Sequence, residues 1–182
     1  MQDERLSEHF MLSEFTKSAT AKAKGIDNSP TLVHKNTLKH TANYLLEPLR
    51  KLYNAKYNSV NSYKGKLVKE VIIRITSGYR SAKLNKAILN SSKTSEHCIG
   101  AAVDIDVVVR FFDGTSETIP FTEVYQDIKK WVRNGNLSVN QCIQEQSGDA
   151  KWVHVSHHPS GKTCDKREFL IYKNGRYYRD NS

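Results

Sequence analysis

The stretch "SEHCIGAAVDID" covers residues 95–106, near the middle of the 182-residue chain, and places His97 and Asp104 seven positions apart. Positions 97 and 104 fall on opposite faces of a straight strand, because side chains alternate along it. The two can converge only if the chain bends between them, and Gly100 supplies the freedom for a bend or bulge. Converging, they would offer zinc two ligands. On spacing alone, a surface histidine followed by a turn acid is the simpler interpretation.

A second stretch, "KWVHVSHH" at residues 151–158, changes that balance. Strand alternation places Trp152, His154 and Ser156 on one face, while the valines between them face a core. His154 therefore faces a polar and partly aromatic surface. Two histidines and one carboxylate give three protein ligands and leave one position open for water, which is typical of catalytic rather than structural zinc. His157 and His158 follow the strand and are interpreted as loop residues.

The rest of the chain predicts helices first and strands later. The expected elements are helices at 13–23, 31–53, 81–89 and 120–134, strands at 67–76, 101–109, 141–145 and 151–156, and a hairpin at 168–179. Gly25 should end the first helix, and Pro48 should kink the second. Gly148-Asp149 and Asn174-Gly175 are expected to form tight hairpin turns. This order predicts an α+β fold in which N-terminal helices pack on a mainly antiparallel sheet.

The length suffices for one domain with a substantial core and hardly for two. We therefore expect a single domain over 1–182, with an N-terminal extension at 1–30, a core at 31–160 and a C-terminal hairpin at 161–182. No apolar run is long enough for a transmembrane helix. "MQDERLSEHF" lacks the pattern of a secretory signal peptide.

Three cysteines, an odd number without a CxxC pair, argue against a disulfide framework. We expect Cys98, Cys142 and Cys164 to be reduced, and Cys98 and Cys142 to act as small strand hydrophobes.

The net charge is +9 and the pI about 9.4. A positive field attracts polyanions such as nucleic acids, anionic membranes or anionic cell-wall polymers. No basic stretch interleaves aromatic residues as nucleic-acid-binding motifs do. A solvated surface with excess lysine explains the charge most simply.

"SEHCIGAAVD" fits the pattern Ser-x-His-x-x-Gly-x-Ala-x-Asp at every specified position, and "WVHVS" supplies a further histidine about fifty residues later. "ITSGYRSAKLNKAI" and "HFMLSEFTKSATAKAKGIDNSP" are similar to the segments that precede this motif in the same group. Over residues 6–156 the chain resembles the zinc D-Ala-D-Ala carboxypeptidases and related bacteriophage endolysins, whose fold is shared with the hedgehog signalling domain.

The resemblance implies one zinc ion per chain, held by His97, Asp104 and His154. It also implies an acidic general base and an arginine, Arg80, in the substrate site. In many relatives the base is a glutamate three residues before the last histidine, but Lys151 occupies that position here.

Glu145 is the better candidate for the base. If residues 148–149 form a two-residue turn, Glu145 pairs with Trp152 and lies diagonal to His154. Diagonal neighbours on adjacent strands lie roughly 7–8 Å apart, within reach of a water at the metal. Asp149 is the alternative base.

The resemblance implies a zinc peptidase that hydrolyses peptidoglycan stem peptides, either as a D-Ala-D-Ala carboxypeptidase or as an endolysin-type endopeptidase. Arg80, Ser95, Tyr79 and Trp152 are the expected substrate contacts. The alternatives are a non-catalytic zinc-binding protein of the same fold and a basic, virion-associated structural protein. We further expect a monomer of phage or bacterial origin, cytoplasmic until released to act on the cell wall, where anionic wall polymers are possible partners.

Overall fold

The computed structural model describes residues 3–58, 60, 62–89, 91–160 and 167–181. Helices dominate the first part of the chain and strands the later part, as the sequence predicts for an α+β fold. The elements in chain order are α1 Leu12–Thr16, α2 Ala19–Lys24, α3 Leu32–Thr41, η1 Ala42–Leu46, α4 Glu47–Lys56, β1 Val68–Ser77, α5 Ala82–Ala87, η2 Glu96–Ile99, β2 Ala102–Phe111, β3 Ser116–Thr118, α6 Phe121–Arg133, β4 Gln141–Ser147, β5 Ala150–Ser156, β6 Glu168–Lys173 and β7 Arg176–Arg179.

The N-terminal segment contains two short helices where the sequence predicted one. Lys17 is extended, with φ −63° and ψ 126°, and Ser18 then caps α2 by accepting the amide of Ala21. Gly25 ends α2 in a left-handed conformation, as predicted. Phe10 and Phe15 are buried in the main hydrophobic cluster, so the segment expected to be an extension contributes to the core.

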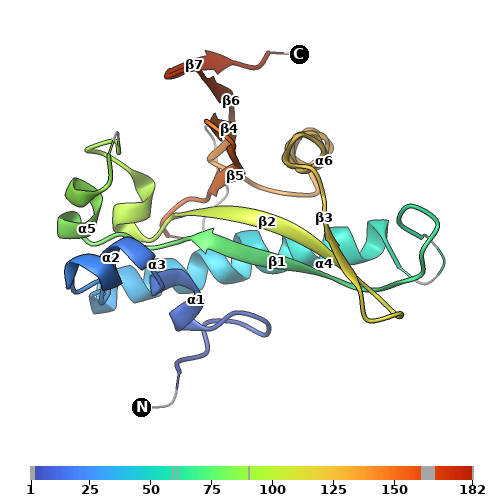
Figure 1. Ribbon diagram of the computed structural model, residues 1–182, viewed down its shortest axis with the longest axis horizontal. Coiled ribbons are helices and arrows are strands. Elements are labelled where there is room, and N and C mark those ends of the chain that lie inside the picture. The colour runs from blue at the N-terminus through green and yellow to red at the C-terminus, as the bar shows by residue number, and fades with distance from the viewer. Residues whose placement is uncertain (1–2, 59, 61, 90, 161–166, 182) are drawn as a thin grey trace.

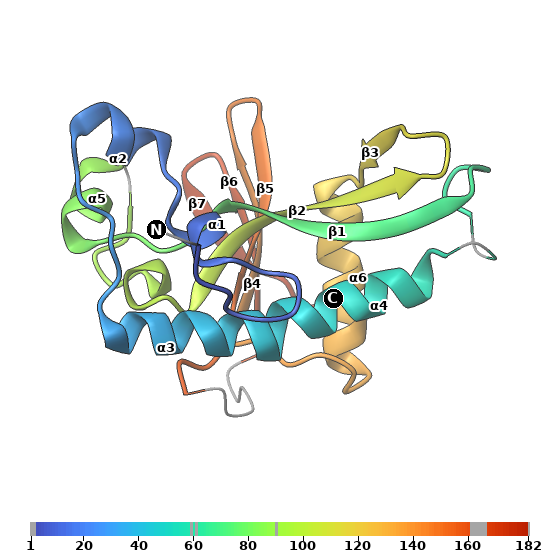
Figure 2. The same ribbon diagram turned by 90° about the horizontal axis from the view of Figure 1, so that it is seen from below.

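The predicted amphipathic helix is present as three consecutive segments, which form one long helix in Figure 2. The expected disturbance near Pro48 takes the form of a π-helical turn at Ala42–Leu46, directly before α4. Pro48 thus lies in the first turn of α4. A wide turn of this kind accommodates the missing proline N–H without breaking the helix.

The sheet has the strand order β1-β2-β5-β4-β6-β7, and β3 also pairs with β2. Every pairing is antiparallel except that of β4 with β6, so the mainly antiparallel sheet is confirmed. The β4–β5 register is the predicted one: Ser147 faces Ala150, Glu145 faces Trp152 and Ile143 faces His154.

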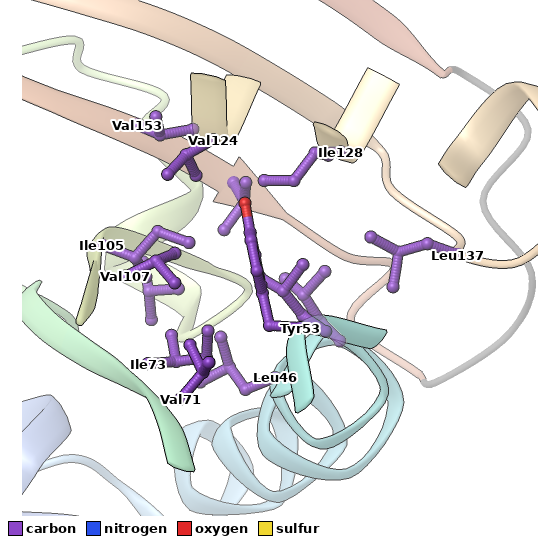
Figure 3. Close-up of a cluster of buried hydrophobic side chains, with 14 of the residues drawn as sticks. Leu46, Tyr53, Val71, Ile73, Ile105, Val107, Val124, Ile128, Leu137 and Val153 are labelled. Carbon is purple, nitrogen blue, oxygen red and sulfur yellow. The ribbon is translucent and has the colours of Figure 1, made fainter. Parts of the chain in front are cut away.

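One face of the sheet packs into the core. Val153 and Val155 of β5 are fully buried, as are Val103 and Val107 of β2. Figure 3 shows such strand residues gathered around Tyr53 from α4 and apolar side chains from α6. Since these alternate positions are used by the core, the intervening side chains of β2 and β5 face the other side.

Figure 1 shows α6 on one side of the strands β5, β4, β6 and β7, with α5 and the loop after it on the other side. Helix α6 contacts β4 and β5. The site described below lies on the side that faces α5.

Among the described residues, no helix has the length and apolar character that a membrane crossing requires. Cys142 and Cys98 are free thiols, but Cys98 lies in the η2 turn and is not the strand residue that was expected. Cys164 lies outside the described residues.

Candidate active site

Asp104 and His154 are cross-strand partners between β2 and β5. Their direct neighbours along each strand are buried valines and isoleucine, so both side chains project from the opposite face. His154 Nδ1 lies 3.0 Å from Asp104 Oδ1. Strand pairing alone therefore brings two of the three predicted ligands together.

His97 reaches the same point from a 3-10 turn, Glu96–Ile99, rather than from the bent strand that the sequence suggested. Its Nδ1 lies 2.7 Å from the carbonyl oxygen of Gly78, just after β1. A carbonyl oxygen only accepts, so Nδ1 carries the proton and Nε2 presents its lone pair. Nε2 lies 3.2 Å from Asp104 Oδ1 and 3.2 Å from His154 Nδ1.

Gly100 ends this turn and is required there for two reasons. Its φ of 78° lies in the left-handed region, which favours glycine. An added Cβ would also lie 3.0 Å from Leu38 Cγ and 3.1 Å from the His34 carbonyl oxygen. The bend predicted at this residue is present, and it lets the chain enter β2 with Asp104 on the same side as His97.

The three donor atoms fit a zinc ion. They lie within 4.8 Å of one another, and all three residues are buried. Ligands about 2.0–2.2 Å from a tetrahedral ion would be about 3.3–3.6 Å apart, close to the distances between these atoms. The donor set, two imidazole nitrogens and one carboxylate oxygen, is also one that zinc prefers.

The buried groups are electrostatically coupled. Burial opposes ionisation of Asp104, but its interactions with the adjacent His97 and His154 outweigh burial and hold the pKa of Asp104 well below its usual range. Burial lowers the pKa of His97. It also opposes protonation of His154, yet the hydrogen bond with Asp104 raises the pKa of His154. Asp104 therefore remains ionised between the two imidazoles, and its negative charge favours binding of a cation.

Arg80 holds the second oxygen of the Asp104 carboxylate. Its Nη2 donates to Asp104 Oδ2 at 2.9 Å and to Ser77 Oγ at 3.0 Å. One oxygen of Asp104 thus faces the histidines while the other faces a guanidinium. The resemblance implied a substrate contact for Arg80, and the geometry adds a contact that orients a candidate metal ligand.

The three candidate ligands lie in a cleft of about 800 Å³. Of the expected substrate contacts, Arg80, Ser95 and Trp152 line it and Tyr79 does not. Residues of the C-terminal hairpin also line it, although no motif in the sequence indicates this. The lining includes Arg80, Ser95, Glu96, His97, Asp104, Gln141, Ile143, Glu145, Trp152, His154, Leu170, Tyr172, Tyr177 and Arg179.

Glu145 is in the cleft, one strand away from His154. Burial raises the pKa of its carboxyl group to about 7, and the charge of Asp104 adds to this while His154 and Arg80 oppose it. A carboxyl group that titrates near neutrality can exchange protons with a reacting water or amine.

The remaining candidates lie elsewhere. Tyr79 is buried and its hydroxyl lies 2.9 Å from His34 Nδ1, so its expected substrate contact is not supported. The Lys151 ammonium lies 5.9 Å from the centre of the Phe121 ring, beside α6. Asp149 is exposed in the β4–β5 turn.

Ser77 and Gly78, which hold Arg80 and His97, were not singled out from the sequence either. Ser77 acts through its hydroxyl and Gly78 through its backbone carbonyl, and no sequence pattern predicts such contacts.

A cleft that joins three convergent candidate metal ligands with a separate carboxyl group suits a metal-dependent hydrolase. The family described as Peptidase M15 matches residues 8–124, and the chain belongs to this family of zinc-dependent peptidases. His97, Asp104 and Arg80 lie within the matched region, whereas His154 and Glu145 lie beyond it. No curated protein and no solved structure gives a significant match.

Proposed function

We propose that this protein is a zinc peptidase that hydrolyses the stem peptides of bacterial peptidoglycan. The observation that carries the proposal is the cleft in which the buried cluster His97–Asp104–His154 opens toward Glu145 and Arg80. Membership of the M15 family supports peptide hydrolysis. The motif "SEHCIGAAVD" with "WVHVS", similar to that of the D-Ala-D-Ala carboxypeptidases and endolysins, supports the substrate class.

In this proposal the two histidines and Asp104 hold the ion, and Arg80 keeps Asp104 oriented. Zinc, when bound there, supplies a Lewis acid that polarises the scissile carbonyl and makes water more acidic. Glu145 accepts the proton of the attacking water and then delivers it to the leaving amine. In the metal-free chain, burial raises the pKa of its carboxyl group to about 7, so Glu145 holds a proton more readily than an exposed glutamate does.

Arg80 has a second task in the proposal. Its guanidinium lines the cleft and is always charged, so it can bind a substrate carboxylate or stabilise negative charge that develops on the carbonyl oxygen. Stem peptides carry a free carboxylate at their D-Ala end and others along their length. The same arginine therefore suits a carboxypeptidase and an endopeptidase.

The test is zinc content combined with digestion of purified peptidoglycan and of soluble stem peptides. Glu145→Gln should retain zinc and fold, while turnover falls about 10²–10⁴-fold, the usual contribution of general acid–base catalysis. Asp149→Asn, in the turn of the same hairpin, is the matched control and should reduce turnover only slightly. An inactive Asp149→Asn beside an active Glu145→Gln would transfer the role of base to Asp149. A zinc-loaded parent that cleaves no stem peptide would refute the proposal in favour of a zinc-binding protein.

Paired peptides distinguish the two reactions. Peptides that end in a free D-Ala should be cleaved faster than their C-terminal amides, since the amide removes the charge that Arg80 would bind. Arg80→Lys should abolish much of this preference, because a point charge does not replace a bidentate guanidinium. Equal cleavage of acid and amide would exclude the carboxypeptidase reaction and favour an endopeptidase.

A further inference from the structure

The C-terminal hairpin β6–β7 forms part of the cleft floor. Glu145 of β4 faces Tyr172 of β6, and Tyr172 faces Tyr177 of β7. Partners in register lie side by side on one face of a sheet. The tyrosine rings are in contact, with centroids 4.7 Å apart. The candidate base and two aromatic rings thus form one row across three strands.

A second row runs parallel to the first and starts at the metal ligands. It passes from Asp104 through His154 and Ile143 to Leu170 and Arg179. All five line the cleft. In Figure 1 the strands β4, β6 and β7 rise away from β2 in this order. The floor therefore continues from the metal ligands outward to the last strand of the sheet.

This floor is longer than the C-terminal residue of a peptide substrate would occupy. From β5 to β7 there are three steps between neighbouring strands, and at about 4.8 Å each they span about 14 Å. An extended peptide covers about 3.3–3.6 Å per residue, so about four residues fit along the floor. The loop after α5, with Ser92 and Thr94, lines the same cleft.

The tyrosines at the far end are open to a ligand and close to the candidate base. Tyr177 is 57% exposed. Partial burial raises the pKa of Tyr177 to about 12, and the negative charge of Glu145 contributes to this shift. Its neighbour Tyr178 is 52% exposed but faces Ile171 across the hairpin, on the other side of the sheet.

We infer that Tyr172 and Tyr177 form a substrate subsite for an extended peptide segment on one side of the scissile bond. The inference rests on the proposed function and deepens it, because it makes peptide length a determinant of specificity. Tyrosine rings provide rigid apolar surface against aliphatic side chains and planar peptide groups, with a hydroxyl at the wet end. A peptide whose scissile bond lies at the metal ligands has to continue along one side of the cleft, and the two rows give it a floor.

The test measures binding and not only turnover. Zinc-loaded Glu145→Gln protein, with and without Tyr177→Ala or Tyr172→Ala, is titrated calorimetrically with a stem pentapeptide and with N-acetyl-D-Ala-D-Ala. Each tyrosine substitution should weaken binding of the pentapeptide about 10-fold, as expected for about 1.4 kcal/mol of lost ring contact. The loss for the dipeptide should be several-fold smaller. Tyr178→Ala is the matched control and should bind both peptides like the parent.

Equal losses for both peptides, or a comparable loss in Tyr178→Ala, would overturn the subsite, because they would report a damaged hairpin. Unchanged pentapeptide affinity would overturn it too. In a further titration with a muropeptide that carries the disaccharide, a loss of affinity confined to this ligand would assign the rings to sugar and contradict a peptide subsite. The two proposals fail differently. A protein that neither binds nor cleaves stem peptides removes both, whereas a protein that cleaves them with its natural Glu145, and whose Glu145→Gln form binds them with an affinity insensitive to both tyrosine substitutions, removes only the subsite.

Discussion

At the scale of single residues, the site depends on the Asp104 carboxylate, which contacts two histidines through one oxygen and an arginine through the other. Asp104 Oδ1 faces both histidines and Oδ2 faces Arg80. Replacing a histidine leaves this carboxylate in place but removes one of three protein donors. A metal site with two donors binds zinc much more weakly than one with three.

We therefore expect His154→Ala to lose most of its metal after dialysis against trace zinc, as measured by elemental analysis per chain. His158→Ala is the control, because His158 is exposed two residues past β5, and it should retain about one zinc per chain. Full occupancy in His154→Ala would refute the assignment of the ligands.

Glu145 makes a prediction about stability and pH in the metal-free protein. Its pKa in the folded chain is about 7, above its ordinary value of 4.5. The folded state thus binds the proton more tightly than the unfolded state, so stability falls as pH rises from about 4.5 to 7. Glu145→Gln removes this loss. At pH 8 the variant should be more stable than the parent, by at most about 3 kcal/mol, and at pH 4 the two should be equal.

Urea unfolding in the presence of a chelator at both pH values measures this difference, with Asp149→Asn as the control on the same hairpin. A variant that gains no stability at pH 8 would show that the Glu145 carboxylate is well solvated.

Residue-level chemistry was predictable where a motif or a hairpin register specified it. The pair His97 and Asp104 came from the motif, and Glu145 came from pairing residues outward from the turn at 148–149. No motif or register specified the direction of Tyr79: in the structure its hydroxyl lies beside His34, whereas the side chain of the next residue, Arg80, reaches Asp104.

At the scale of elements, the N-terminal segment supports the turn that carries His97. Phe15 packs so closely on Gly78 that an added Cβ there would lie 2.4 Å from the Phe15 carbonyl oxygen. The amide of Tyr79 also donates to that oxygen at 2.7 Å. The Gly78 carbonyl in turn holds Nδ1 of His97. Helix α1 therefore supports this candidate metal ligand through Gly78, which contacts both Phe15 and His97.

Gly78→Ala should therefore reduce both stability and metal affinity. The added methyl group should push α1 away from the end of β1 and lower the free energy of unfolding by about 1–3 kcal/mol, as is typical of overpacking. It should also shift the Gly78 carbonyl that orients His97, which should weaken zinc binding about 10-fold or more. Gly114→Ala is the control: its φ of 83° makes alanine strained, but nothing lies within 4 Å. It should lose stability and keep its zinc affinity, measured by chelator competition. Unchanged zinc affinity in Gly78→Ala would exclude a role of the N-terminal segment in supporting His97.

The elements that local sequence encodes were predictable, and those set by long-range packing were not. Asn174-Gly175 and Gly148-Asp149 specify hairpins by turn chemistry, and both hairpins are present. The parallel pairing of β4 with β6 depends on where the chain returns after β5, for which no local signal exists. The π-helical turn before Pro48 likewise follows from how the long helix absorbs a proline within the fold.

At the scale of the whole molecule, the net charge of +9 leads to a prediction about attachment to the cell wall. A positive surface should hold the protein near anionic wall polymers, and salt screens such attraction over about 8–10 Å at physiological ionic strength. Binding to purified cell walls, measured by co-sedimentation, should fall steeply as salt rises from 50 mM to 500 mM. Walls stripped of their anionic polymers provide the control. Salt-independent binding would contradict an electrostatic attachment.

The strand order has a consequence for how the protein behaves at high concentration. β7 is the terminal strand of the described sheet, and all four of its residues are exposed. A bare edge strand is a template for sheet-to-sheet aggregation between molecules. Its sequence, Arg-Tyr-Tyr-Arg, opposes this, because antiparallel pairing of two copies about its centre would set Arg176 of each against Arg179 of the other, and like charges directly opposite destabilise a sheet. We therefore expect the two arginines to disfavour pairing of β7 between molecules while its tyrosines stay uncovered.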